Sequence, residues 1–287
     1  MVGMRRRDSY ILITPLALVV LALVAFPTLY SYYASLFGVH LSDTRRPFVG
    51  MDNYINMLTN PSFYHSVFYS LKFSVLATLV EIILGIGLAV LMNRSFKGKG
   101  ISTSLILLPM MVAPSLFALI FRLGLNEFVG IIPYYLKMIG IDQNPFDPEW
   151  VNTTLIAIDA LQWIPFVFII IYAGLTTIPE DIYEASHIDG ASPVQAFFTI
   201  TLPMLVPSIA TAAFLRGIDA FKIYDMIYVL TNGGPGESTT SVSMFIYKKA
   251  FLDGDLGGAA AASLLLSLIL AFPLSLAMKY VLKKEGQ

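Results

Sequence analysis

The sequence predicts an all-α integral membrane protein with six transmembrane helices and both termini in the cytoplasm. Hydrophobic residues make up 56% of its 287 residues and charged residues only 13%, whereas soluble domains carry about 25% charged residues. The mean hydropathy is +0.73. A helix of about 20 apolar residues crosses a bilayer core of about 30 Å, and several stretches of this chain are that long.

The six predicted spans run from about 11 to 36, 73 to 92, 101 to 121, 151 to 178, 200 to 231 and 256 to 278. The apolar run of the first span exceeds the usual h-region of about 7 to 15 residues, so we expect it to be an uncleaved span. The turn-forming sequence "LTNGGPGEST" (230 to 239) should end the fifth. We therefore expect one transmembrane domain over residues 1–287, with an extra first span, a core bundle from about 68 to 281 and a cytoplasmic loop from about 179 to 200.

Lysine and arginine in short loops indicate on which side the termini lie. One face carries basic residues in short segments, namely Arg5, Arg6, Arg7, Arg94, Lys97, Lys99, Lys279, Lys283 and Lys284. Those of the opposite face are spread over much longer loops, namely Arg45, Arg46, Lys72, Arg122, Lys137, Lys248 and Lys249. This bias favours cytoplasmic termini in a multi-pass protein of the cell membrane. The loop at 179 to 199 then faces the cytoplasm, although it contains no lysine or arginine.

The composition also excludes several classes of function. There is no cysteine, and a net charge of −1 offers no basic tail for nucleic acid. No stretch matches the phosphate-binding pattern G-x-x-x-x-G-K-[ST], so any ATP hydrolysis must come from another chain. His65 and His187 lack a second ligand at metal-binding spacing. Paired catalytic carboxylates, an H-E-x-x-H helix or a nucleophile with its base are not visible, so we predict no catalytic residue, no metal and no cofactor in this chain.

The polar stretch "EASHIDGASPVQAFFTITLP" (184 to 203) lies between two apolar segments. Before it, Pro179 and two acidic residues suit the first turn of a helix. Gly190 can take the left-handed conformation that stops a helix, and Ser192 with Gln195 forms a capping box that starts another. The pattern predicts a helix, a sharp bend and a second helix. By itself it fits an ordinary capped loop as well as a docking surface.

This stretch resembles the EAA loop of binding-protein-dependent ABC importer permeases, whose pattern is E-A-A, three residues, G, nine residues, I-x-L-P. Glu184, Ala185, Gly190, Ile200, Leu202 and Pro203 fall on that spacing, and Ser186 replaces the third small residue. Further stretches resemble the carbohydrate branch, with its maltose-type first permease subunit: "VGMDNYINMLTNPSFYHSV" (49 to 67), "IPEDIYEAS" (178 to 186) and "FKIYDMIYVLTNGGPGEST" (221 to 239).

The resemblance implies a type I ABC importer permease (MetI-like) fold and an ATP-driven sugar importer. Its expected partners are a second homologous permease, two cytoplasmic ATPase subunits that hold ATP and Mg²⁺, an extracytoplasmic sugar-binding protein and membrane lipid. The EAA loop would be the coupling helix that inserts into the ATPase. The residues expected in that contact are Tyr183, Glu184, Ala185, Ser186, Asp189, Gly190 and Ala191.

Polar side chains in the fourth span mark a candidate substrate pathway, because polar residues inside a membrane are costly. Asp159, Gln162, Trp163 and Phe166 recur at i, i+3, i+4 and i+7, which places them on one helix face. Sugar hydroxyls bind carboxylates and amides, and sugar C–H faces stack on aromatic rings. The alternative is that Asp159 and Gln162 merely hydrogen-bond a neighbouring helix.

The fifth span carries four charges spaced three apart: Arg216, Asp219, Lys222 and Asp225. Each step slips by about 60° on a continuous helix, so Arg216 and Asp225 should lie on opposite sides and cannot share one pore. We predict a self-paired polar spiral in which Asp219 or Tyr224 touches the pathway. A structural ion-pair ladder is the alternative. Glu81, the lone charge of the second span, fits a packing contact or a gate.

Three classes of function remain to be separated. The first is a sugar importer permease, with polyols or glycerol phosphate as alternative solutes. The second is a proton-coupled carrier, which would use Glu81, Asp159 and the charges of the fifth span; an inverted repeat would support it, and none is visible. The third is an intramembrane enzyme, for which the required motifs are missing.

Overall fold

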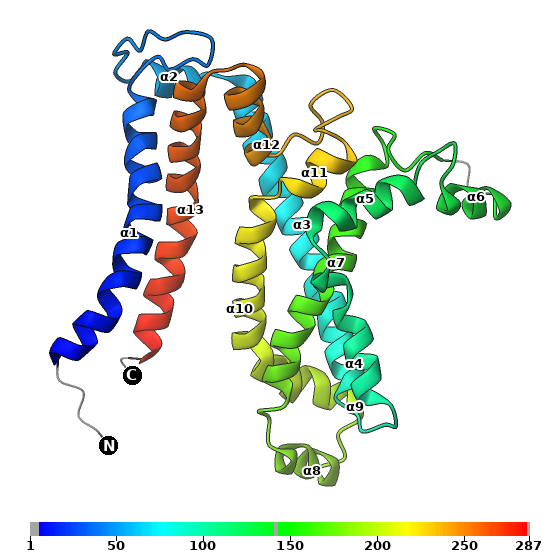
Figure 1. Ribbon diagram of the computed structural model, residues 1–287. Helices are drawn as coiled ribbons and strands as arrows, with labels where there is room; N and C mark the ends of the chain where they lie inside the picture. Colours follow the sequence, from blue (N-terminus) through cyan, green and yellow to red (C-terminus); the bar gives the residue numbers. More distant parts are fainter. Residues whose placement is uncertain (1–5, 141–142, 286–287) are drawn as a thin grey trace. The chain divides into compact units, whose positions relative to one another are not determined.

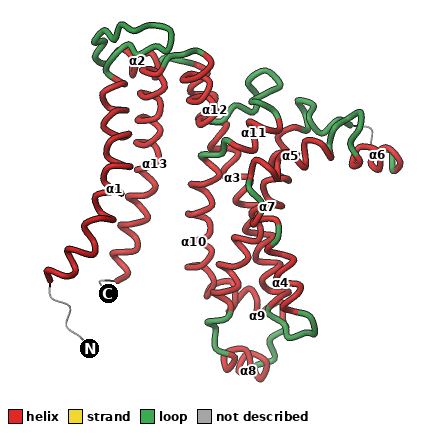
Figure 2. Tube along the Cα trace, viewed as in Figure 1, coloured by secondary structure: helices red, strands yellow, loops and turns green. Residues whose placement is uncertain are grey.

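A computed structural model describes the backbone of residues 6–140 and 143–285, and side chains from Thr14 to Ala271 within those ranges together with that of Ser275. The elements of the described residues are helices, joined by loops and two isolated β-bridges (Figure 2). Contacts divide the chain into two units. One comprises Met1–Tyr64 with Phe245–Gln287, and the other His65–Met244.

The first unit pairs the two ends of the chain. Helices α1 (Arg6–Ser35) and α13 (Leu256–Glu285) lie side by side (Figure 1). The short helix α2 (Asp52–Leu58) is tied to the end of α1, because the Asn53 amide donates to the carbonyls of Ser35 at 2.8 Å and Phe37 at 3.1 Å. Helix α12 (Val242–Tyr247) and the π-helix Lys248–Leu252 lead from the second unit into α13.

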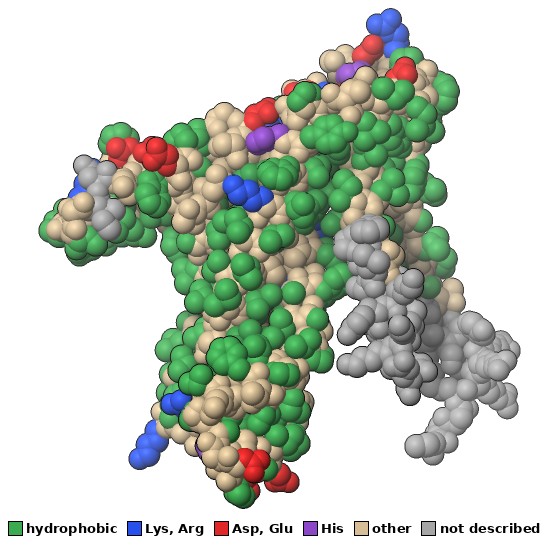
Figure 3. Space-filling model, turned by 180° about the vertical axis from the view of Figure 1, so that it is seen from behind, with side chains coloured by type: hydrophobic (Ala, Val, Ile, Leu, Met, Phe, Trp, Pro, Cys, Tyr) green, Lys and Arg blue, Asp and Glu red, His purple; other side chains and the backbone are tan. Residues whose placement is uncertain are grey.

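The second unit is built around α3 (Pro61–Met92), α7 (Val151–Leu175) and α10 (Leu202–Phe221). Helices α5 (Pro114–Gly124), α6 (Ile131–Met138) and α11 (Asp225–Leu230) lie at one end of it. Helices α4 (Lys99–Leu107), α8 (Glu180–Ile188) and α9 (Pro193–Ala196) lie at the other (Figure 1). On the face that Figure 3 shows, hydrophobic side chains are spread along the length of the unit, as expected of a surface that meets lipid.

Two hydrophobic clusters fill this unit. One packs Phe73 and Ala77 of α3 against α5, α7 and α11, and the other packs Ala89 of α3 against Phe168 of α7 and Leu205 of α10. On α3, Glu81 falls between Ala77 and Ala89, so a charged group lies between two apolar clusters. Burying a charge is unfavourable unless it is paired, and the site described below supplies the pair.

Four helices are long and apolar enough to cross a membrane among the described residues: Thr14–Ser35, Pro61–Met92, Val151–Leu175 and Pro193–Phe221. They correspond to the first, second, fourth and fifth predicted spans. Helix α13 covers the sixth, with an apolar stretch from Leu256 to Ala271. The count of six spans and the cytoplasmic position of the termini remain predictions. Of the basic residues used for orientation, Arg5 lies outside the described residues, as do the side chains of Arg6, Arg7, Lys279, Lys283 and Lys284.

Two predicted spans are not continuous helices. The third breaks into α4, a 3-10 turn (Pro109–Met111) and α5, with Val112 extended between them. Pro109 and Pro114 cause the breaks, because proline cannot donate the helical hydrogen bond. The fifth ends at Phe221, and α11 starts at Asp225 after a short turn. The prediction of uninterrupted helices over 101 to 121 and 200 to 231 is therefore wrong.

Candidate functional site

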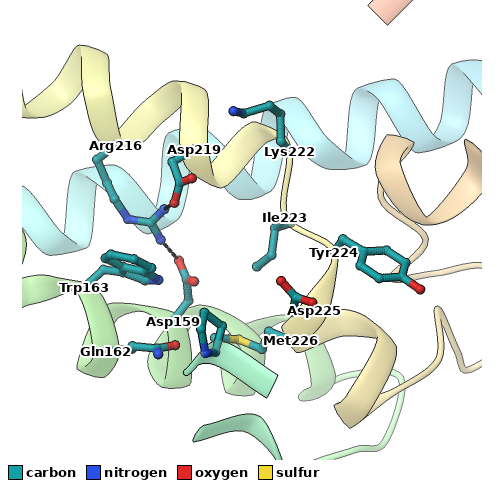
Figure 4. A pocket seen from close by; sticks show the side chains of 11 residues that line it. Asp159, Gln162, Trp163, Arg216, Asp219, Lys222, Ile223, Tyr224, Asp225 and Met226 are labelled. Carbon is teal, nitrogen blue, oxygen red and sulfur yellow. Dashed lines mark hydrogen bonds and ion pairs between the residues drawn. The ribbon is translucent and has the colours of Figure 1, made fainter. Parts of the chain in front are cut away.

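A polar cavity of about 260 Å³ lies inside the second unit (Figure 4). Its lining comes from Pro114, from Asp159, Gln162 and Trp163 of α7, from Arg216 and Asp219 of α10, and from the segment Lys222, Ile223, Tyr224, Asp225 and Met226. The cavity thus collects polar groups from the fourth and fifth predicted spans.

The break after α10 brings the charges of the fifth span to this one cavity. The sequence predicts that Arg216 and Asp225 lie on opposite sides of a helix, and that prediction is wrong because the helix ends at Phe221. The chain then turns through Lys222 and Tyr224, and Asp225 begins α11 facing the same space (Figure 4). Arg216, Asp219, Lys222 and Asp225 therefore all line the cavity.

Arg216 is the centre of a buried charge cluster. Its side chain is 2% exposed, and each of its three nitrogen atoms contacts a carboxylate. Nε lies 2.8 Å from Oε2 of Glu81 on α3, Nη1 lies 3.1 Å from Oδ2 of Asp219 on α10, and Nη2 contacts Oδ2 of Asp159 on α7. The planar guanidinium suits such multiple pairing. We call these four residues the Arg216 cluster, and it joins three helices.

The cluster contains three residues for which the sequence left two roles open. Asp159 contacts a neighbouring helix through Arg216 and also lines the cavity. Arg216 pairs with Asp219 within one helix, as in a self-paired spiral, and also with two other helices. Glu81 has no exposed surface, contacts Arg216 and is not among the residues lining the cavity; its role as a packing contact or a gate remains open.

The remaining residues of the predicted pathway fall into two groups. Gln162, Trp163 and Tyr224 line the cavity. The Gln162 amide donates to the carbonyl of Val112 at 3.0 Å, and the Arg216 guanidinium carbon lies 5.0 Å from the centre of the Trp163 ring, a cation–π geometry. Phe166 contacts Trp163 edge-on at 6.3 Å and packs against the apolar cluster of α3, α7 and α10. It does not line the cavity.

The predicted EAA loop is a helix, a bend and a second helix. Helix α8 ends next to Gly190, whose φ is +79°, and the capping box of Ser192 and Gln195 starts α9 with both hydrogen bonds present. Glu184, Ala185, Asp189 and Gly190 are exposed. Figure 1 shows α8 at the far end of the unit from α11. The predicted turn chemistry is confirmed, whereas the role in coupling remains a prediction.

One hydrogen bond connects this loop to the bundle, and two others lie within the loop. The Tyr183 hydroxyl lies 2.9 Å from the hydroxyl of Thr201, at the start of α10. Ser186 is buried and donates to the carbonyl of Tyr183 at 2.8 Å. The partly buried Ala191 donates its amide to the carbonyl of Ser186 at 3.0 Å. The loop therefore exposes part of its surface and is attached through Tyr183 to the residue directly before α10.

The sequence reasoning missed the roles of Arg216, Lys222 and Asp225 at the cavity. One signal was available for Arg216: it is a cation deep in an apolar span, and such a charge requires carboxylates from other spans. Glu81 and Asp159 were the remaining charges of the second and fourth spans. For Lys222 and Asp225 the position depends on the break in the helix, which the sequence did not reveal.

A helical membrane bundle with an internal polar cavity and an exposed helical loop at one end defines a membrane transport subunit. The chain belongs to the family of binding-protein-dependent transport system inner membrane components, whose family model matches residues 81–286. It is therefore a multi-pass membrane protein, and the family resemblance of its EAA loop is confirmed.

Two sugar-transport permeases are similar to this chain over most of its length. The trehalose/maltose transport system permease protein MalF of Thermococcus litoralis is 36% identical over 285 residues, which cover 97% of this chain and 93% of that protein. The trehalose transport system permease protein SugA of Mycobacterium tuberculosis is 30% identical over 267 residues, covering 91% and 84%.

Solved structures show the fold. A crystal structure of a bacterial ABC transporter that imports the acidic polysaccharide alginate matches with a TM-score of 0.82 at 22% identity, and the match covers 96% of each chain. The methionine ABC transporter MetNI matches with a TM-score of 0.54 at 14% identity, over 76% of this chain and 94% of that one. The predicted MetI-like permease fold is thereby confirmed.

Proposed function

We propose that this chain is a permease subunit of an ATP-driven, binding-protein-dependent sugar importer, and that its polar cavity is part of the substrate pathway. The cavity carries the proposal, because it places carboxylates, an amide and aromatic rings around one space inside an apolar bundle. Such groups bind the hydroxyls and the C–H faces of a sugar. The names of the trehalose and maltose relatives support the same class of solute. Glycerol phosphate is an alternative, because another relative, 28% identical, is a glycerol-phosphate permease.

The partners in this proposal supply what the chain lacks. A second permease completes the pathway, two cytoplasmic ATPase subunits bind ATP and Mg²⁺, and an extracytoplasmic protein delivers the sugar. The chain itself is proposed to hydrolyse nothing and to hold no cofactor. The exposed residues Glu184, Ala185, Asp189 and Gly190 form the proposed contact with the ATPase. Tyr183 attaches the loop to the bundle, while Ser186 and Ala191 make hydrogen bonds within the loop.

A single helix connects the proposed coupling surface to the cavity. Tyr183 contacts Thr201, directly before α10 begins at Leu202. Arg216 lies about 20 Å further along α10 at a rise of about 1.5 Å per residue, and it contacts α3 and α7. Movement of α8 by the ATPase would therefore reach, through α10, the three helices that the Arg216 cluster joins. This is how ATP binding would open and close the pathway.

The test is uptake of labelled trehalose and maltose by vesicles that contain the complete complex. Uptake should require ATP, the ATPase and the binding protein, and Trp163→Leu should reduce it at least tenfold while the complex still assembles. Asp159 is a poor first target, because its removal leaves Arg216 buried with one partner fewer. Uptake that follows a proton gradient without the ATPase would overturn the proposal in favour of a secondary carrier.

The proposed orientation has a separate test. A cysteine at Gly234, beyond α11, should react with an impermeant thiol reagent added outside intact cells. A cysteine at Ser192 in the EAA loop should react only after the membrane is opened. Since the natural chain has no cysteine, both variants start from an unlabelled background. Reversed labelling would contradict both the cytoplasmic termini and ATPase docking at the loop.

A further inference from the structure

The Arg216 guanidinium is already engaged by the protein itself. Each of its three nitrogen atoms contacts a carboxylate, from Glu81, Asp159 and Asp219, and its face lies over the ring of Trp163. Figure 4 shows Asp159 and Asp219 on the cavity side of this group. An arginine that is free in a binding site captures carboxylates and phosphates through paired hydrogen bonds. Here those positions are taken by protein carboxylates.

The charge around the cavity is negative. Among the residues that line it, three carboxylates face two cations: Asp159, Asp219 and Asp225 against Arg216 and Lys222. A solute that carries a carboxylate or phosphate would be brought close to this excess negative charge. Like charges repel one another, so such a solute should bind less tightly than an uncharged one.

The cavity also presents an acceptor without a partner. Gln162 lines the cavity and is 1% exposed. Its side-chain oxygen is buried and has no hydrogen-bond partner among the described residues. A buried acceptor in this state requires a donor. Sugar hydroxyls donate hydrogen bonds, whereas the oxygens of an ionised acid group only accept them.

We infer that this cavity selects uncharged polyhydroxy solutes over anionic ones, and that Asp219 sets this selectivity by occupying Arg216. The inference rests on the proposed function, since it names the class of sugar that the pathway takes. Neutral glycosides bring the hydroxyl donors that Gln162, Asp159 and Asp219 can accept. Sugar acids and sugar phosphates meet excess negative charge and an arginine that is already paired.

Two variants separate the pairing of Arg216 from net charge. Asp219→Asn removes one negative charge and weakens the contact at Nη1 of Arg216, on a side chain that is 55% exposed. Asp225→Asn removes one negative charge from the same cavity. Within the described part of the chain, Asp225 forms no ion pair with Arg216 and receives a long hydrogen bond from Ser115, at 3.5 Å. The second variant is the matched control.

The experiment measures equilibrium binding to the purified complex of permeases and ATPases in nanodiscs, without the binding protein, so that the selectivity of that protein does not enter. The probes are labelled trehalose and maltose, each compared with the derivative in which one primary alcohol is oxidised to a carboxylate. The wild-type complex should bind the neutral sugar at least about tenfold more tightly than its acid. Asp219→Asn should reduce this ratio by about tenfold, and Asp225→Asn by less than about threefold.

Each outcome decides a separate point. Equal binding of acid and neutral sugar by the wild-type complex would overturn the selectivity while leaving the sugar importer in place. Equal effects of the two variants would overturn the role of the Arg216 pairing. Binding of neither sugar pair, together with no uptake in vesicles, would contradict the proposed function itself.

Discussion

The Arg216 cluster and the EAA loop both carry several charged residues. Most charges of the cluster are buried and paired, whereas those of the loop are exposed. In the cluster, Arg216, Glu81 and Asp159 are at most 2% exposed and contact one another. In the loop, Glu180, Asp181, Glu184 and Asp189 are exposed, and none forms an ion pair within the described part of the chain. Buried charges must be paired inside the fold, whereas exposed ones remain available to a partner.

This difference separates residues that hold the bundle from residues that act on something outside it. Removal of one member of a buried pair leaves its partner desolvated and uncompensated, which is strongly destabilising. Surface substitutions away from such features usually change stability by less than about 0.5 kcal/mol. Substitutions in the two regions should therefore separate loss of the fold from loss of coupling.

The largest expected effect follows from Arg216→Met, which leaves the buried carboxylates of Glu81 and Asp159 without their cation. We expect a loss of about 3–5 kcal/mol in stability, seen as a lower thermal midpoint and a reduced amount of the subunit in the membrane. Lys222→Met is the control, because Lys222 is an exposed cation of the same cavity and should change the midpoint little. An Arg216→Met subunit as stable as the control would show that the cluster does not hold the three helices together.

A second effect on the bundle should come from Gly85→Ala on α3. A Cβ atom at Gly85 would lie 2.7 Å from Cγ1 of Val167 on α7, whereas one at Gly87, on the same helix, would meet nothing within 4 Å. Overpacking of this kind costs about 1–3 kcal/mol. Gly87→Ala should be neutral or slightly stabilising because alanine favours the helix. Thermal unfolding of the two variants in one detergent would compare them, and equal midpoints would rule out close packing of α3 on α7.

Local sequence signals predicted the structure of the EAA loop but not that of the cavity. Ser192 and Gln195 define a helix start within four residues, so the sequence predicts the capping box that the structure contains. Pro109 and Pro114 also carried the signal for the breaks in the third span, but the apolar pattern around them dominated the prediction. Local structure can therefore be predicted from the sequence where the interacting residues are close together in the chain.

The break at the end of α10 depends on residues far along the chain. Ser243 donates to the carbonyl of Lys222 at 3.0 Å, and Ser241 donates to that of Ile223 at 2.6 Å. These side chains satisfy carbonyls that a continuous helix would have used, and no proline or glycine marks the position. The pairing of Glu81 and Asp159 with Arg216 also crosses three helices, so it could not be derived from the spacing within one span.

A smaller effect on stability is expected from Gly190→Val in the loop. Gly190 has φ of +79° and open space around its Cβ position, so the substitution strains only the backbone, by about 1–2 kcal/mol. Gly98→Val is the matched control, because Gly98 has φ of +89° and equally open surroundings before α4. Both subunits should insert and remain in the membrane. Only Gly190→Val should reduce co-purification of the ATPase and sugar-stimulated ATP hydrolysis; equal losses in both would mean that strain anywhere at this end is sufficient.

The smallest effect on stability is expected from Glu184→Lys, and it tests the comparison most sharply. Glu184 is exposed on α8, so reversing its charge should change the free energy of unfolding by less than about 0.5 kcal/mol. Glu149→Lys makes the same change at an exposed acidic residue directly before α7, at the end of the unit away from α8. If the loop docks on the ATPase, Glu184→Lys should lower co-purification of the ATPase and uncouple ATP hydrolysis from uptake, while Glu149→Lys should leave both intact. Normal values for Glu184→Lys would mean that this exposed charge meets no partner, and the coupling role would then have to lie on another surface of the loop.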